Sequence, residues 1–304
     1  MSVIFFHMNP ERIEIVTDTG SSMKPDDEQV KQLGVHILPL RVIFSQDGKV
    51  DDLSDLDMTS EELYSRMRGA KQLPTTSGSV TGGATEIYEK LAKETDSILS
   101  VHVTSEHSTV CDSANAAARE VKEKYPYLKI IVVDSKSISL GTWFLVEQAA
   151  DMAQHGAKLT EIEEALLNTR GKIELIAAFR DLKNALKGGR LHLPSQVANF
   201  LGNKFGNISA VVRLSGVDGK IKLPKPMPSE TRARWEIVKE LQREKREIVK
   251  IGVVHTNVPE IAEEMKTKLS SFISSNIPIS KVEAGPALSV HGGEGLVAFI
   301  YQTK

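Results

Sequence analysis

The stretch SILSVHVTSEHSTVCDSANAAAREV, residues 97–121, decides the fold. A run rich in apolar and β-branched residues passes through a small polar turn into a helical pattern. Two other such runs, 13–17 and 129–134, also end in small polar turns, DTGSS and DSKSIS. Helical patterns alternate with these runs, around 59–70, 83–94, 109–124 and 141–155. This alternation predicts an α/β fold with a mainly parallel sheet and right-handed crossovers.

The second half of the chain has a different rhythm. Its predicted strands are 173–179, 208–214, 248–255 and 295–301, and its predicted helices lie near 181–187, 195–202, 229–246 and 259–272. The turn SGVDGK, residues 215–220, predicts a chain reversal and some antiparallel pairing. We therefore expect two packed α/β domains, a mainly parallel one over 1–157 and a smaller mixed one over 158–304.

Composition excludes several classes of protein. The 38 basic and 40 acidic residues leave a formal charge of −2, which disfavours a nucleic-acid partner. The basic stretch 232–250 is interleaved with glutamates, so we expect a solvated helix face with Trp235, Val238 and Leu241 as its buried stripe. Cys111 is the single cysteine, which suits a reducing cytoplasm, and no apolar run is long enough for a membrane span. We expect a cytoplasmic location.

Two hydroxyl-rich segments are candidates for binding an anion. Thr75, Thr76 and Ser77 precede the helical pattern at 83–94, and Ser105 and Ser108 follow the run 97–103. Hydroxyls beside helix N-termini can bind a carboxylate or phosphate, and they can equally serve as helix caps. The carboxyl ends of parallel strands are the usual place for such a site. Neither segment is a P-loop.

Other polar residues carry weaker signals. His107, Ser108 and Asp112 lack the glycine elbow of a serine hydrolase, and Asp18 and Asp134 lack metal-ligand spacing, so we predict no catalytic residue and no metal site.

Two basic residues stand next to glycines. Arg190 follows Gly188 and Gly189, which can adopt left-handed angles and end a helix. His291 precedes a glycine-rich turn, where it is available to hold an anion or transfer a proton.

Six segments taken in order resemble the DegV family, whose members bind fatty acids and include the binding subunits of bacterial fatty acid kinase. They are VTDTGSS (16–22), PTTSGS (74–79), TSEHSTVCDSA (104–114), VDSKSISLG (133–141), LKGGRL (186–191) and GPALSVHGGEG (285–295). The resemblance runs from about Ile13 to Tyr301.

This resemblance implies a long-chain fatty acid, palmitate- or oleate-like, in an apolar tunnel between two α/β domains. Its carboxylate would be held by Thr76 and Ser108, with Thr75, Ser77 and Ser105 as near neighbours. Arg190 and His291 match the family residues at the carboxylate end, which hand the lipid to a separate kinase. The implied protein is a carrier without a cofactor or ATP site of its own, and not an enzyme.

The chain also departs from the family pattern. Thr-Ser-Gln-Pro becomes Thr76, Ser77, Gly78 and Ser79, and Leu-Ser-Gly-Thr becomes His107, Ser108, Thr109 and Val110. The alternative function is an enzyme acting on a small carboxylated or phosphorylated substrate at the same loops, with Arg190 and His291 as electrostatic partner and acid or base. A short polar cleft would favour the enzyme, and a long apolar tunnel would favour the carrier.

Overall fold

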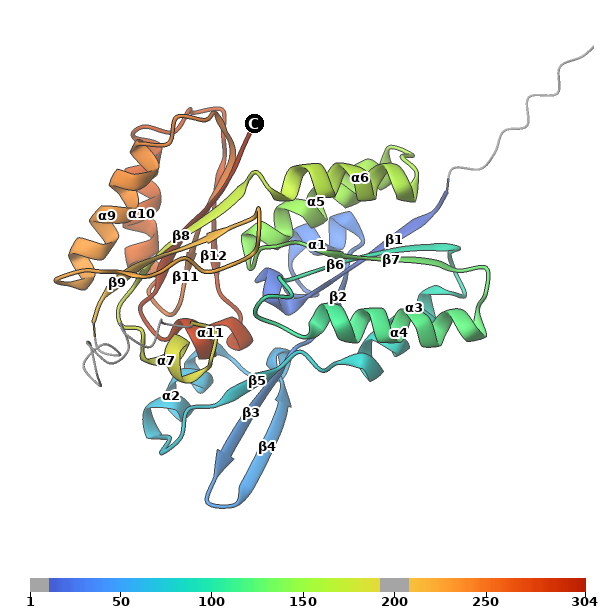
Figure 1. Ribbon diagram of the computed structural model, residues 1–304, viewed down its shortest axis with the longest axis horizontal. Coiled ribbons are helices and arrows are strands. Elements are labelled where there is room, and N and C mark those ends of the chain that lie inside the picture. The colour runs from blue at the N-terminus through green and yellow to red at the C-terminus, as the bar shows by residue number, and fades with distance from the viewer. Residues whose placement is uncertain (1–10, 192–207) are drawn as a thin grey trace, which may run out of the picture.

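A computed structural model describes residues 11–191 and 208–304, which fold into three sheets with flanking helices (Figure 1). The predicted helix at 195–202 and the first ten residues lie outside the described part. The first sheet has the order β2-β1-β6-β7 and is parallel throughout, as the sequence predicts. Its strands are β1 (Ile13–Asp18), β2 (His36–Leu38), β6 (Ser97–His102) and β7 (Lys129–Asp134).

Helices cover both faces of this parallel sheet (Figure 1). Neighbouring strand residues point to opposite sides, so Ile15 belongs to one apolar core and Val16 to another. β6 is buried along its whole length, which is typical of a central parallel strand. The helices are α1 (Glu28–Leu33), α5 (Leu140–Gln154) and α6 (Leu159–Arg170) on one side, and α3 (Thr81–Leu91) and α4 (Val110–Lys124) on the other.

A small antiparallel sheet, which the sequence patterns did not predict, has the order β4-β3-β5. The hairpin of β3 (Arg41–Gln46) and β4 (Lys49–Ser54) turns at Asp47 and Gly48, both with positive φ, which suits a tight hairpin. β5 (Thr75–Ser77) pairs with β3. The prediction that residues 75–77 lie at a helix N-terminus is therefore wrong, because they form a strand and α3 begins only at Thr81. Helix α2 (Ser60–Gly69) and the short 3₁₀ helices η1 (Thr19–Ser21) and η2 (Asp55–Asp57) complete the first half.

The third sheet is mixed and has the order β10-β9-β8-β13-β11-β12, with only β11 and β12 parallel. Residues 215–220 do reverse the chain, and β10 pairs antiparallel with β9. The strands are β8 (Ile173–Phe179), β9 (Ala210–Ser215), β10 (Lys225–Pro226), β11 (Ile248–His255), β12 (Ile279–Glu283) and β13 (Val297–Thr303).

One face of the mixed sheet packs on α9 (Glu230–Gln242) and α10 (Pro259–Ser270). Ile237, Val238 and Leu241 form the buried stripe of α9, whereas Trp235 is 47% exposed. The prediction of a buried Trp235 is wrong, because its ring lies at the surface, beneath the Lys268 ammonium, 4.9 Å from the ring centroid.

The other face of the mixed sheet looks toward α5 and two short helices, α7 (Lys183–Lys187) and α11 (Pro286–Gly292) (Figure 1). α6 follows the predicted domain boundary, and it packs against α5, β6 and β7 of the first half. The division at residue 157 stays a prediction. Among residues 11–191 and 208–304, no helix combines the length and the hydropathy needed to cross a membrane.

Candidate functional site

A cavity lies between the mixed sheet and the loops at the carboxyl ends of the parallel strands. Its volume, measured as the space open to the centres of water-sized spheres, is about 150 Å³. This is roughly ten times the 10–15 Å³ that a single water molecule needs. One wall, which we call the sheet wall, consists of aliphatic and aromatic side chains of the mixed sheet: Leu175, Ala177, Phe179, Val212, Leu214, Val254, Ala298 and Ile300.

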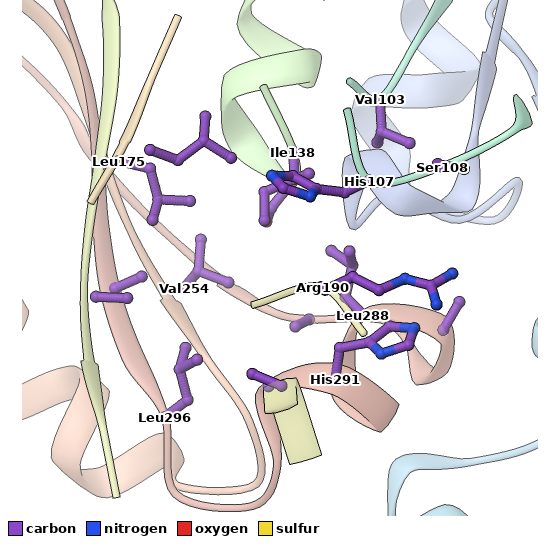
Figure 2. Close-up of a pocket in the computed structure, with 18 of the residues that line it drawn as sticks. Val103, His107, Ser108, Ile138, Leu175, Arg190, Val254, Leu288, His291 and Leu296 are labelled. Atoms are coloured by element: carbon purple, nitrogen blue, oxygen red, sulfur yellow. The ribbon is translucent and has the colours of Figure 1, made fainter. Parts of the chain in front are cut away.

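The opposite wall, which we call the polar wall, gathers hydroxyl and basic groups from distant parts of the chain: Thr76, Ser77, His107, Ser108, Arg190 and His291. Figure 2 shows His107, Ser108, Arg190 and His291 on one side of the cavity and Leu175, Val254 and Leu296 on the other. The sheet wall is therefore apolar, and the polar wall carries hydroxyl, imidazole and guanidinium groups.

Thr76, Arg190 and His291 form a hydrogen-bonded group at the polar wall. Thr76 Oγ1 and His291 Nε2 lie 2.6 Å apart, and Arg190 Nη2 donates to the same Thr76 oxygen over 3.4 Å. Burial, and then the charges of Arg190 and His107, lower the pKa of His291 to about 3. His291 is consequently neutral near pH 7, and burial also lowers the pKa of Arg190 without removing its charge.

Gly188 and Gly189 have different tasks beside this group. Gly188 has an ordinary helical φ of −74°, but a Cβ at this position would lie 2.4 Å from His291 Nδ1 and 3.0 Å from Asn184 O. Gly189 has a φ of 68° and open space around it. The helix end thus uses Gly189 to adopt a left-handed angle and Gly188 to let the imidazole ring approach the backbone. Arg190 Nη1 donates back to Gly188 O over 2.7 Å.

Ser108 stands just before α4. Its Oγ accepts a hydrogen bond from Val110 N at 3.3 Å, so the hydroxyl faces the first turn of a fifteen-residue helix, where the partial charge is positive. A Cβ on Gly78 would come within 2.7 Å of Ser108 Oγ, which shows how closely the segment after β5 approaches this serine. Glycine at position 78 is therefore what allows β5 and the start of α4 to share one wall.

Helix α11, which carries His291, is fixed from two sides. Asn184 Nδ2 of α7 donates to Val290 O over 3.0 Å. Near the N-terminus of α11, the buried Asp55 accepts a 2.6 Å hydrogen bond from Thr19 Oγ1. Burial, together with the nearby Asp18 carboxylate, raises the pKa of Asp55 to about 7. The hydrogen bonds from Thr19 and from the Ala287 amide, in the first turn of α11, act against this rise.

The structure brings five of the seven predicted site residues to the cavity: Thr76, Ser77, Ser108, Arg190 and His291. Thr75 and Ser105 are exposed and do not line it. Ser105 Oγ donates to Asp134 Oδ2 at 2.5 Å, and Asp134 also pairs with Lys136, so both are occupied in loop bracing. Thr76 lies on strand β5 and pairs with Val42 of β3, whereas the hydroxyl pattern predicts it beside a helix N-terminus.

Asp18 lies outside the cavity lining, in a buried chain of hydrogen bonds. It caps η1 through Gly20 N at 2.8 Å, and its Oδ2 lies 2.8 Å from His102 Nδ1. His102 Nε2 in turn lies 2.7 Å from Ser100 Oγ. All members of this chain are fully buried, so they hold the strand ends together. Within the described part of the chain, no group of three His, Cys, Asp or Glu residues is arranged to hold a metal.

The sequence patterns predict none of the residues of the sheet wall. Its signal was available, because Leu175, Ala177 and Phe179 alternate along one strand and so share one face. The alternation does not reveal that this face borders a cavity, since the opposite face of the same strand also has apolar residues, Ile176 and Ala178, and packs on α9.

Comparisons with known proteins agree with this architecture. A family model described as uncharacterised protein, DegV family, matches residues 12–304. A DegV domain-containing protein of Listeria innocua is 31% identical over 293 residues, covering 96% of this chain and 99% of the relative.

Two solved structures show the same fold. A DegV family protein from Thermus thermophilus, described by its fatty acid binding, matches with a TM-score of 0.80 at 24% identity, over 96% of this chain and 100% of that one. A DegV family protein from Eubacterium eligens, loaded with heptadecanoic acid, matches with a TM-score of 0.79 at 21% identity, again over 96% and 100%. Sequence and fold lead to one conclusion: this chain belongs to the DegV family.

Proposed function

We propose that this protein binds one long-chain fatty acid, palmitate- or oleate-like, with its tail against the sheet wall and its carboxylate at the polar wall. The observation that carries the proposal is the division of a single cavity into an apolar side and a side with hydroxyl and basic groups. The fatty acid binding described for the Thermus thermophilus and Eubacterium eligens proteins supports it.

The proposed carboxylate ligands are Thr76 and Ser108, with Ser77 beside them. When the proton of the neutral His291 is on Nε2, both His291 and Arg190 donate to Thr76 Oγ1, and the hydroxyl proton of Thr76 is left for the carboxylate. Each buried methylene of the tail contributes about 0.8 kcal/mol, so the tail provides most of the affinity and the hydroxyls fix the position of the head. Thr75 and Ser105 are exposed and would act only through their neighbours.

The proposed role is that of a cytoplasmic carrier that presents the lipid to a separate fatty acid kinase. Arg190 is half-buried at the polar wall and keeps its charge, so it can meet a phosphoryl group near the carboxylate. Arg190→Ala should therefore retain bound lipid and lose phosphorylation by an added fatty acid kinase. Loss of lipid binding in this variant would contradict that division of roles.

The apolar sheet wall favours the carrier over an enzyme for a small polar substrate, which would leave that wall unfilled. Native mass spectrometry of the purified protein, with delipidation and reloading by palmitate or oleate, tests the proposal. We expect a co-purified or reloaded fatty acid at a stoichiometry of one. A protein that carries no fatty acid and takes up neither lipid would overturn the proposal.

A further inference from the structure

The strand register of the sheet wall arranges its side chains in rows that run across the strands. Ala177 of β8 pairs with Val212 of β9 on one side and with Ala298 of β13 on the other, and Ala298 pairs with Val254 of β11. All four residues line the cavity. This set, which we call the alanine row, therefore crosses four strands in the order β9, β8, β13, β11.

Larger side chains stand on both sides of the alanine row. Two residues along the strands in one direction, Leu214, Leu175 and Ile300 are paired with one another in the same way. In the other direction, Phe179 lies two residues beyond Ala177, and Leu296 two residues before Ala298. These side chains also line the cavity. The row is thus a shallow trough with the two alanine methyl groups at its centre and Val212 and Val254 at its ends, and it lies between a ridge of aliphatic side chains and a ridge containing Phe179 and Leu296.

Helices close both sides of the trough. Toward the Leu175 ridge, Leu140 of α5 packs so tightly on Gly252 of β11 that a Cβ there would lie 2.2 Å from Leu140 Cδ1. Gly252 pairs with Ile300, so α5 covers the end of that ridge. Toward the Phe179 ridge stand α7 and α11, which are joined by the Asn184 to Val290 hydrogen bond. The alanine row lies between the two sets of helices, where it lines the cavity.

We propose that the acyl tail lies along the alanine row, across strands β9, β8, β13 and β11, and that Ala177 and Ala298 determine which tails the cavity accepts. The inference rests on the proposed function and specifies the path of the tail within it. Three steps between neighbouring strands, each about 4.8 Å, make the row roughly 14 Å long from Val212 to Val254, a direction along which an extended alkyl chain can lie. Alanine at the two central positions leaves the room that the tail occupies, since any longer side chain would project into it.

The proposal can be tested by larger side chains in the alanine row. Ala177→Leu and Ala298→Leu each add three carbon atoms, and we expect at least a tenfold loss of affinity for hexadecanoate in titrations of delipidated protein.

The matched pair of variants is Ala177→Val and Ala178→Val. These neighbours on β8 receive the same added atoms, but Ala178 faces the core beneath α9. Ala177→Val should weaken binding several-fold and Ala178→Val should leave it unchanged. Wild-type affinity in both leucine variants would overturn the inference.

A second measurement needs no variant, so it does not depend on how the substituted proteins fold. Hexadecanoic acid carrying a diazirine within the tail is bound to the wild-type protein and photolysed, and the adducts are mapped by peptide mass spectrometry. We expect adducts on the peptides of β8 and β13. Adducts confined to segments outside the mixed sheet would refute the proposed path.

The outcomes separate the two proposals. A wild-type protein that binds no hexadecanoate defeats the proposed function itself. A wild-type protein that binds it, while the leucine variants bind equally well and the adducts lie elsewhere, leaves the proposed function intact and defeats only the alanine row.

Discussion

The two walls of the cavity are built by opposite means. The sheet wall comes from strands whose regular register places apolar side chains in rows, and its residues lie within 175–300. The polar wall comes from the ends of elements, a three-residue strand, a helix start, a glycine turn and a short helix, drawn from positions 76 to 291. A regular sheet is enough to bury an alkyl tail, whereas binding a head group needs individual hydrogen-bonding atoms placed around it from several directions. Four experiments test this difference.

The largest effect should come from making the sheet wall polar. Val254→Asp places a carboxylate in the alanine row, where the described neighbours are apolar, and we expect fatty acid binding to be lost. An uncompensated buried charge should also reduce the free energy of unfolding by about 3–5 kcal/mol. Lipid extraction and urea unfolding measure the two effects. Retained lipid in a folded Val254→Asp protein would show that the sheet wall does not contact the tail.

Removing the hydroxyls of the polar wall should have the next largest effect. Hydrogen bonds to a charged group contribute about 1.5–3 kcal/mol each, so the double variant Thr76→Val, Ser108→Ala should bind fatty acid roughly a hundredfold more weakly or worse. Thr76→Val also leaves His291 Nε2 without its partner, so it should lower stability more than Ser108→Ala does. Isothermal titration and thermal melts separate these effects. Unchanged lipid retention in the double variant would refute the head-group assignment.

The two adjacent glycines provide a matched pair with a smaller effect. Gly188→Ala pushes a methyl group against His291 and should cost about 1–3 kcal/mol of stability while weakening binding about tenfold. Gly189→Ala strains a left-handed residue for about 1 kcal/mol but meets no neighbouring atom, so binding should persist. Titration with palmitate compares the variants. Equal losses of affinity in both would mean that the position of the imidazole ring is unimportant.

Replacing Asp55, which lies behind the polar wall, should have the smallest effect on binding. Its main effect should be on how stability depends on pH. Its pKa is raised from 3.8 to about 7, so it contributes stability below pH 3.8 that is lost as the pH rises through about 7. Asp55→Asn should remove this loss, so its advantage over the wild type should grow from pH 5 to pH 8. Urea unfolding at both values measures it, with the exposed Asp57→Asn as control. An advantage that does not change with pH would contradict the assignment.

Local patterns predicted three of the four strands of the parallel sheet, β1, β6 and β7, and missed the three-residue β2. Runs such as 97–102 are short, apolar and bounded by polar turns, and buried parallel strands need no partner of a particular sequence. The same reasoning missed β4, whose residues are exposed or half-buried and show no alternation, and β5, which has only three residues. Both depend on pairing with β3, which is a tertiary property.

Thr76 does line the cavity, but not for the reason that the sequence suggests. The hydroxyl pattern suggested a helix start, yet the residue lies on a strand, and its contact with His291 spans 215 positions. No local signal encodes such a contact. Gly188 shows the same limit, since its sequence context indicates a helix end and only the folded chain shows the histidine ring against it.

The position of β13 affects when a newly made chain can complete its cavity. β13 follows the other described strands in the sequence, yet it lies between β8 and β11 at the centre of the mixed sheet. The ribosome therefore releases β8 and β9 long before the strand that joins them to β11. The parallel sheet can form early in synthesis, but the mixed sheet must wait for Ala298, so the sheet wall of the cavity is completed only when this last described strand has been made.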